Sequence, residues 1–162
     1  MGLQEWVETF RALHLRAKDG KLDEREMERY HAGREELAQA LLTAQRITLK
    51  PGETARGLLR VPRAMQADIA VTAGKQRVMT LDIFAGGFSA MLGIGLPMGE
   101  RNAVTLKMPA GADPITCEAK VTGVKRQGGT YRVSFEFEQL PAADADRLAF
   151  LVFDAALDSL KK

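Results

Sequence analysis

The spacing of the apolar residues changes at Lys50-Pro51-Gly52, and this change divides the chain into a helical part and a β-rich part. Before the break, apolar residues recur three and four positions apart, which is the spacing of one helix face. After it, apolar and polar residues alternate, as in half-buried β-strands. Proline followed by glycine ends a helix. We therefore expect a helical segment at residues 1–50 and a β-rich segment at residues 51–162.

The first segment predicts two helices joined by a short turn. Residues 3–17 place their apolar side chains on one face, and Asp19-Gly20 ends this helix. Asp23 with Glu26 three positions later is a capping-box pattern, which starts a second helix that is expected to run to about Arg46. Helices joined by so short a turn are expected to pack together as a hairpin.

One face of the second predicted helix has the spacing of a coiled-coil seam. Its members are three and four positions apart: Met27, Tyr30, Arg34, Leu37, Leu41 and Ala44. A homodimer through these N-terminal helices and packing within one chain are both open. Arg34 argues against a long coiled coil, because a buried charge needs a partner.

The second segment predicts six short strands and a closing helix. The strands are expected at 66–72, 76–83, 86–92, 102–108, 115–125 and 130–138, and the helix at about 142–160. Short strands in close succession, with no helices between them, favour an antiparallel sheet closed into a barrel or sandwich. The fold class is therefore mainly β with flanking helices.

The composition excludes several classes of partner. The chain has 23 basic and 21 acidic residues among 162, which is too balanced for a nucleic acid polymer or an anionic membrane as partner. Its apolar stretches all fall short of the roughly 20 residues of a membrane span. The cytoplasm is the expected location.

The sequence lacks a recognisable catalytic or metal-binding motif. His14 and His31 are 17 residues apart and have no metal-ligand spacing around them. The glycines form neither a phosphate-binding loop nor a dinucleotide-binding pattern, and no nucleophile elbow occurs. We expect a protein that is not an enzyme and has no resident cofactor.

One constellation of charged residues does stand out. Arg56 and Arg60 lie four positions apart and precede Val61-Pro62, and Asp82-Ile-Phe-Ala-Gly-Gly87 follows about 20 residues later. This arrangement resembles the PilZ domain family, whose members carry Arg-x-x-x-Arg before the first strand and Asp/Asn-x-Ser-x-x-Gly after a later one. Tyr131-Arg-Val-Ser-Phe-Glu-Phe137 followed by a helix is also similar. The resemblance covers about residues 54–155 and implies a six-stranded antiparallel β-barrel.

The resemblance implies a site for cyclic di-GMP. PilZ domains characteristically bind this dinucleotide, and the matching residues here are Arg56, Arg60, Asp82 and Gly87. An arginine can bind the O6/N7 edge of guanine with two hydrogen bonds, stack on its ring or pair with phosphate. The carboxylate can accept from guanine N–H groups, and the glycine lets the backbone approach.

The sequence departs from the family pattern at Phe84, which stands where the family has serine. The loss of one hydrogen bond at such a position costs roughly 1–3 kcal/mol. Two functions follow by resemblance. The chain is a cyclic di-GMP receptor or effector that regulates a signalling or motility protein. Alternatively, it is a degenerate adaptor that no longer binds the dinucleotide and acts through protein contacts. On the residues alone, an ordinary solvated arginine pair beside a strand remains open for Arg56 and Arg60.

Overall fold

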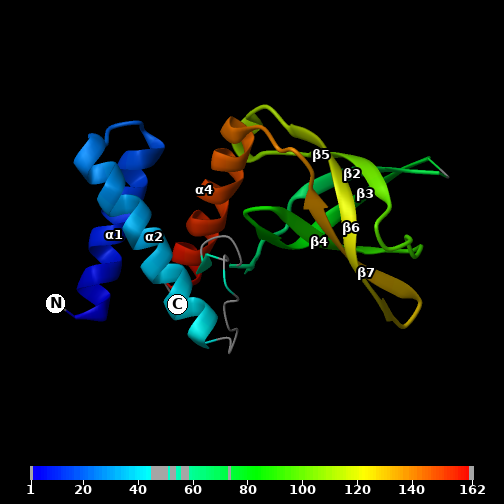
Figure 1. The fold of residues 1–162 in the computed structure, drawn as a ribbon, viewed down its shortest axis with the longest axis horizontal. Coiled ribbons are helices and arrows are strands. Elements are labelled where there is room, and N and C mark those ends of the chain that lie inside the picture. Colours follow the sequence, from blue (N-terminus) through cyan, green and yellow to red (C-terminus); the bar gives the residue numbers. More distant parts are fainter. Residues whose placement is uncertain (1, 45–50, 52–53, 56–58, 73, 161–162) are drawn as a thin grey trace. The chain divides into compact units, whose positions relative to one another are not determined.

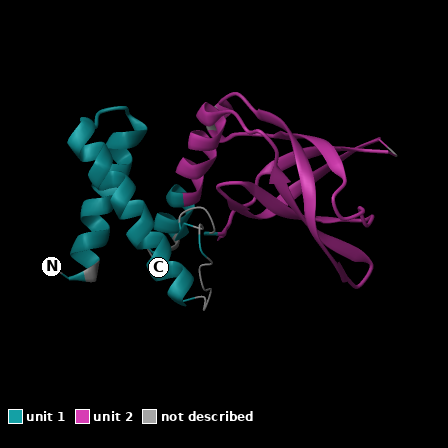
Figure 2. Cartoon of the chain, viewed as in Figure 1, with its two compact units in different colours: residues 1–59, 153–162 teal, residues 60–152 magenta. Residues whose placement is uncertain are grey.

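The computed structural model describes residues 2–44, 51, 54–55, 59–72 and 74–160. It contains two compact units, residues 1–59 with 153–162 and residues 60–152, which are coloured separately in Figure 2. Helix α4 (Ala142–Ser159) contributes residues to both. The expected division of the chain into domains 1–50 and 51–162 stays a prediction.

The second unit is the expected six-stranded antiparallel barrel (Figure 1). Its long strands are β2 (Gln66–Val71), β3 (Gly74–Phe84), β4 (Gly87–Leu92), β5 (Arg101–Leu106), β6 (Ile115–Gln127) and β7 (Thr130–Phe137). They pair in the order β3-β2-β5-β6-β7-β4, and β4 pairs again with β3 and closes the ring. Since every one of these strands has two neighbours, the barrel leaves no long open edge among them.

Two short elements were not predicted from the sequence. Strand β1 (Val61–Pro62) pairs with β3 on the same edge as β2, so that β1 and β2 follow each other along β3. The 3-10 helix η1 (Pro109–Gly111) lies in the expected loop after β5. Both are two or three residues long, which is too short for a periodic pattern to reveal.

The barrel core consists of the inward side chains of all six long strands. Phe88 and Phe135 lie opposite each other on β4 and β7, with ring centroids 5.1 Å apart, and both are fully buried. Alternate residues on the same strands therefore belong to the outer face, where Arg132 is open to solvent and Ser89 is nonetheless fully buried. This alternation decides which side chains can form a surface site.

Helices α1 (Leu3–Lys18) and α2 (Glu24–Ala44) pack together in the first unit. The capping box is confirmed, because the Glu26 amide donates to the Asp23 carboxylate at 2.8 Å and the Asp23 amide to Glu26 at 3.3 Å. Gly33 allows close helix contact, since a Cβ there would lie 2.6 Å from the Phe10 ring.

The seam expected on α2 is only partly correct. The buried residues are Tyr30, Gly33, Arg34, Leu37, Ala38 and Leu42. Met27 and Ala44 are exposed, and Leu41 is half-buried. A straight helix has 3.6 residues per turn and drifts away from a strict 3.5-residue seam, which explains why Leu42 replaces Leu41. A homodimer through the N-terminal helices stays a prediction.

Arg34 has the partners that its buried position requires. Its guanidinium donates to the Tyr30 hydroxyl at 3.0 Å and lies 4.6 Å from the centroid of the Tyr30 ring. The Tyr30 hydroxyl also lies 2.5 Å from Nδ1 of His14, and Nε2 of His14 lies 3.4 Å from Asp154 on α4. Burial lowers the pKa of His14 to about 4, although Asp154 acts in the opposite direction. The histidine is therefore a neutral member of a buried polar network at neutral pH.

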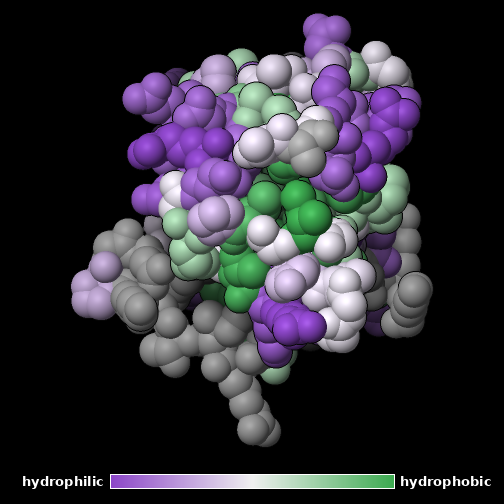
Figure 3. Space-filling model, turned by 90° about the vertical axis from the view of Figure 1, so that its right-hand side faces the viewer, coloured by the Kyte–Doolittle hydropathy of each residue, from purple (hydrophilic) through white to green (hydrophobic). Residues whose placement is uncertain are grey.

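The surface of the described residues includes some exposed apolar side chains. Leu15 and Met27 lie on the first unit, and Met79, Leu81, Ile94 and Met98 on the barrel. Figure 3 shows one face, on which hydrophobic side chains gather at the centre among hydrophilic ones. Exposed apolar area of this kind is typical of surfaces that contact other proteins.

Gly87 is expected to be indispensable for the pairing of β4 with β7. A Cβ at this position would lie 2.0 Å from the carbonyl oxygen of Phe135, so the strands would have to separate. Gly87→Ala should lower the free energy of unfolding by about 2 kcal/mol or more in urea titrations. Gly93→Ala is the matched control, because a Cβ there meets nothing within 4 Å. Equal stability of the two variants would contradict this account.

The buried His14 should make the helical unit less stable in mild acid. Between pH 6.5 and about 4, His14 is protonated in the unfolded chain but stays neutral in the folded protein. The free energy of unfolding therefore falls as the pH falls through this window. Asp154, Arg34 and Lys18 are the charged groups that act on it. Relative to His14→Gln, the wild type should lose about 2–3 kcal/mol more between pH 7 and pH 4.5.

Fluorescence of Trp6, the single tryptophan, reports this unfolding from α1. His31→Gln, at an exposed position on α2, is the control and should behave as the wild type. Identical pH dependence of wild type and His14→Gln would refute the burial argument.

Candidate functional site

The turn between β3 and β4 sets the geometry of the candidate site. Phe84 pairs with Gly87, so that only Ala85 and Gly86 form the turn. In a hairpin with so short a loop the register is fixed, and Asp82 comes to lie opposite Ser89. A bulge between Thr80 and Asp82 shifts the alternation of β3 by one residue. Thr80 and Ile83 are buried as a result, while Asp82 and Phe84 lie on the outer face.

Asp82 lies at the centre of a group of polar side chains from four segments. Its Oδ1 accepts a hydrogen bond from the Ser89 hydroxyl at 2.8 Å and lies 3.5 Å from Nη1 of Arg60. Its Oδ2 accepts from Nη2 of Arg132 at 2.7 Å. The carboxylate side chain is 13% exposed, whereas those of Arg60 and Arg132 are 42% and 41% exposed. A largely covered carboxylate therefore holds two guanidinium groups that remain open to solvent.

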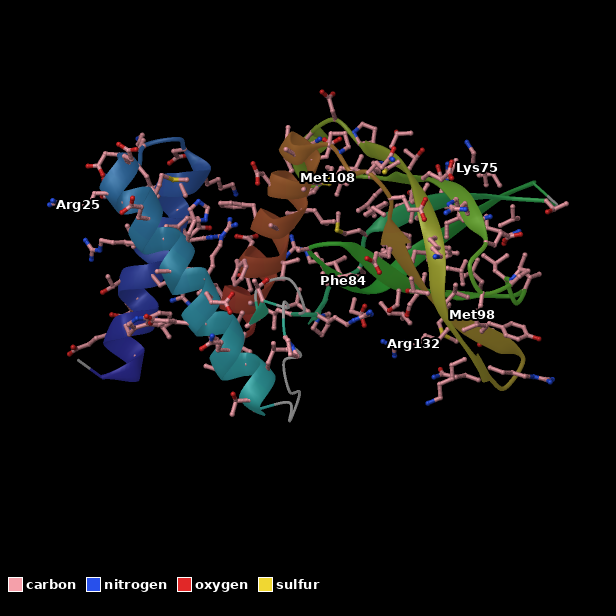
Figure 4. The ribbon with its side chains drawn as sticks, in the orientation of Figure 1. Arg25, Lys75, Phe84, Met98, Met108 and Arg132 are labelled. Carbon is pink, nitrogen blue, oxygen red and sulfur yellow. The ribbon has the colours of Figure 1, made fainter. Side chains whose placement is uncertain are left out.

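Arg60 is placed by the short strand β1. Val61 pairs with Ile83, which brings the preceding residue, Arg60, level with Phe84. The Arg60 guanidinium lies 4.3 Å from the centroid of the Phe84 ring, within the range of a cation–π contact. The ring is on the outer face and not inside the barrel, and a Cβ on Gly86 would lie 3.2 Å from it. Phe84 thus forms a flat platform beneath Arg60 (Figure 4 labels Phe84 and Arg132).

Gly87 is buried and lies within the β4–β7 pairing. The absence of a Cβ is required by the carbonyl of Phe135, as described above. A structural role is therefore sufficient to explain this glycine. It also fixes the turn that brings Asp82 opposite Ser89.

Of the four expected ligand-binding residues, Arg60 and Asp82 are in direct contact in the structure. Gly87 lies at the adjacent turn. Arg56 lies outside the described residues. Two members of the group were missed by sequence reasoning, Ser89 and Arg132. The two-residue turn could have revealed Ser89, because counting back from Ala85-Gly86 pairs it with Asp82. Arg132 alternates with the buried Val133, which predicts an outward position but not its partner.

We call Arg60, Asp82, Phe84, Ser89 and Arg132 the Asp82 site. Two guanidinium groups and one carboxylate give it a formal charge of +1, which favours an anionic ligand. The guanidinium forks can bind phosphate or the edge of a guanine, while the Phe84 ring already lies against the Arg60 guanidinium. Among the described residues, no group of three or more histidine, cysteine or acidic residues could hold a metal ion. Nor does the described part contain a helix long and apolar enough to cross a membrane.

Solved structures share the barrel. The motility inhibitor MotI/DgrA of Bacillus subtilis is 19% identical, with a TM-score of 0.55 over 62% of this chain and 50% of its own. The PilZ domain of Escherichia coli YcgR with c-di-GMP is 18% identical, with a TM-score of 0.51 over 64% of this chain and 92% of its own. The Klebsiella pneumoniae MrkH–c-di-GMP complex is 16% identical, with a TM-score of 0.54 over 71% and 56%. The chain thus spans about half the length of two of these proteins.

At these identities the structural similarity establishes the fold alone. No curated protein matches the sequence significantly. The model of the PilZ domain family, in contrast, matches residues 54–154, which include the whole barrel, the Asp82 site and the first part of α4. This chain therefore belongs to the PilZ domain family.

Proposed function

We propose that this chain is a cyclic di-GMP receptor that binds the dinucleotide at the Asp82 site. The observation that supports this most is the contact between Arg60 and Asp82, which are 22 residues apart in sequence and belong to the two motifs of the family pattern. The family and the named complexes of YcgR and MrkH with c-di-GMP supply the ligand class. A non-catalytic role agrees with the family.

Each side chain has a proposed role that follows from its chemistry. Asp82 accepts hydrogen bonds from the N–H groups of one guanine. Arg60, and Arg56 four positions earlier in the sequence, bind the guanine edge or a phosphate. Arg132 adds a third guanidinium, and the fully buried Ser89, which pairs with Asp82 from β4, donates to the Asp82 carboxylate and holds it in place. Gly87 keeps the turn in place.

The ligand signal would pass through the segment that carries the two arginines. Residues 50–62 connect the helical segment to the barrel along the chain. A dinucleotide held by Arg56 and Arg60 would restrict the conformations of this connecting segment. This restriction would change the surface that the helices present to a partner protein. The proposed partner is a signalling or motility protein, in keeping with the family and with the motility inhibitor among the related structures.

A degenerate adaptor without ligand is the second candidate, and two observations favour it. Both oxygens of Asp82 are already occupied by Ser89, Arg60 and Arg132. Phe84 covers the position where the family has a small hydroxyl and holds Arg60 by its ring. In this case the barrel would serve only as a scaffold for protein contacts.

Calorimetry with cyclic di-GMP distinguishes the two candidates. For the receptor, the wild type should bind and Arg60→Ala should bind roughly 10- to 150-fold more weakly, because one charged hydrogen-bonding group is lost. Arg77→Ala is the matched control: Arg77 also pairs with a barrel aspartate, Asp68, at 3.0 Å. The control should bind as the wild type.

Two results would count against the receptor. Folded wild-type protein that gives no heat at high micromolar ligand would leave the adaptor as the function. Equal losses for Arg60→Ala and Arg77→Ala would show that general charge, and not the Asp82 site, attracts the ligand.

Phe84→Ser should tighten binding of cyclic di-GMP by roughly 5- to 150-fold, because the new hydroxyl pairs with a ligand group whose lack of a partner costs about 1–3 kcal/mol. Phe84→Ala is the companion variant, since it removes the ring without adding a hydroxyl. An equal gain in both would assign the effect to steric relief. Weaker binding in both variants would instead make the Phe84 platform a part of the ligand site and contradict the expected gain.

A further inference from the structure

A depression on the barrel unit shares no residue with the Asp82 site. It has a volume of about 300 Å³ and is lined by Arg63, Ala64, Met65, Gln66, Met79, Lys107, Met108, Pro109 and Gly111. In Figure 4, Met108 lies above both Phe84 and Arg132. We call this depression the methionine pocket.

The backbone on one side of the pocket is fixed by Thr80. Between β1 and β2 the regular pairing with β3 is interrupted at residues 63–65, although the Arg63 amide still donates to the Leu81 carbonyl at 3.4 Å and the Thr80 amide to the Met65 carbonyl at 2.8 Å. The buried Thr80 hydroxyl adds two further hydrogen bonds to this stretch. It accepts from the Met65 amide at 2.9 Å and donates to the Arg63 carbonyl at 2.5 Å. The wall at residues 63–66 is therefore a built feature of the barrel.

The opposite wall is the segment that follows β5. The Lys107 amide donates to the Gln66 carbonyl at 2.9 Å, which joins the two walls. The 3-10 helix η1 then turns the chain, and Gly111 adopts a φ of +73°, which favours glycine. Both walls thus belong to hydrogen-bonded backbone, and the pocket exists without a ligand.

Three methionines from separate segments supply the apolar lining. Met65 and Met108 are 6% and 5% exposed and form the floor, whereas Met79 is 53% exposed at the rim. Thioether side chains are unbranched and polarisable, so they adapt to different apolar groups and are common at surfaces that bind varied peptides. This lining fits one or two aliphatic side chains better than a polar nucleotide.

The charges at the pocket have one sign. Arg63 and Lys107 line it, and none of its nine lining residues is acidic. The charge of the chain as a whole is nearly balanced, with 23 basic and 21 acidic residues, so the excess of positive charge is local to the pocket. Charge complementarity therefore points to an occupant with carboxylates beside its apolar anchor.

We propose that the methionine pocket docks a short acidic segment of a partner protein through an aliphatic anchor side chain. The volume is at the small end of ligand pockets, which suits an anchor residue and not a large cofactor. Anchors of this kind carry most of the binding energy of a peptide interface, and the surrounding charges set its specificity. The pocket would operate whether or not the Asp82 site binds a nucleotide.

Methyl NMR of the full chain, labelled at the methionine methyl groups, tests the proposal. The chain has seven methionines, of which three line the pocket, while Met27 and Met98 are exposed elsewhere and act as internal controls. The probe is the capped hexapeptide Asp-Glu-Leu-Leu-Glu-Asp, compared with Lys-Arg-Leu-Leu-Arg-Lys. The acidic peptide should shift the signals of Met65, Met79 and Met108, and bind at least about tenfold more tightly than the basic one.

Two charge-reversal variants sharpen the result. Lys107→Glu should weaken the binding of the acidic peptide by about tenfold or more. Lys75→Glu makes the same change of net charge on β3, away from Met108 in Figure 4, and should bind as the wild type. Methyl spectra of both variants without peptide report whether the fold is intact.

Several outcomes would overturn the proposal. Absence of shifts at millimolar acidic peptide, shifts spread equally over Met27 and Met98, or equal binding of the basic peptide would each exclude an acidic docking segment. Shifts of the same size with octanoate at the same concentration would assign the pocket to a small apolar anion and not to a peptide.

Discussion

The position of Asp82 on the outside of the barrel is the constraint on which the candidate site depends. It results from two local features, the bulge between Thr80 and Asp82 and the two-residue turn at Ala85-Gly86. Without the bulge, the alternation of β3 would turn Asp82 toward the core, where an unpaired carboxylate is costly. With it, the carboxylate reaches Ser89 and two arginines. Gly87 keeps this turn pressed against β7.

Most of the fold could be predicted from the sequence because its patterns are long and regular. The six strands, the capping box at Asp23 and the closing helix follow from period-two alternation, cap chemistry and helical spacing. The prediction of the buried face of α2 is less accurate, because a coiled-coil seam repeats every 3.5 residues whereas the helix has 3.6 residues per turn. On α4 the buried residues Phe153 and Leu157 belong to the helical unit, while the buried residues Leu148 and Val152 belong to the barrel unit. One helix that serves two units cannot be described by a single apolar stripe.

The site was predictable only as far as local motifs reach. The family pattern identified Asp82 and Arg60, which the structure places in contact. It did not identify Arg132, which lies 50 residues beyond Asp82 and joins it only through the closure of the barrel. Closure is a non-local property, and alternation alone gives the face of a residue but not its neighbour on another strand. The motif does not determine the direction of the Phe84 side chain, and the structure places its ring on the outer face against Arg60.

The account therefore rests on an exposed pair of arginines held by one carboxylate, with an aromatic platform at its side. A crystal structure of the chain with bound cyclic di-GMP tests it most directly. We expect one guanine within hydrogen-bonding distance of the Asp82 carboxylate, Arg60 in contact with the same nucleotide, and Arg132 still beside both. Electron density for the dinucleotide at any other place would contradict the proposed receptor site. So would a crystal grown at saturating ligand in which the Asp82–Arg132 pair is unchanged and no nucleotide is bound.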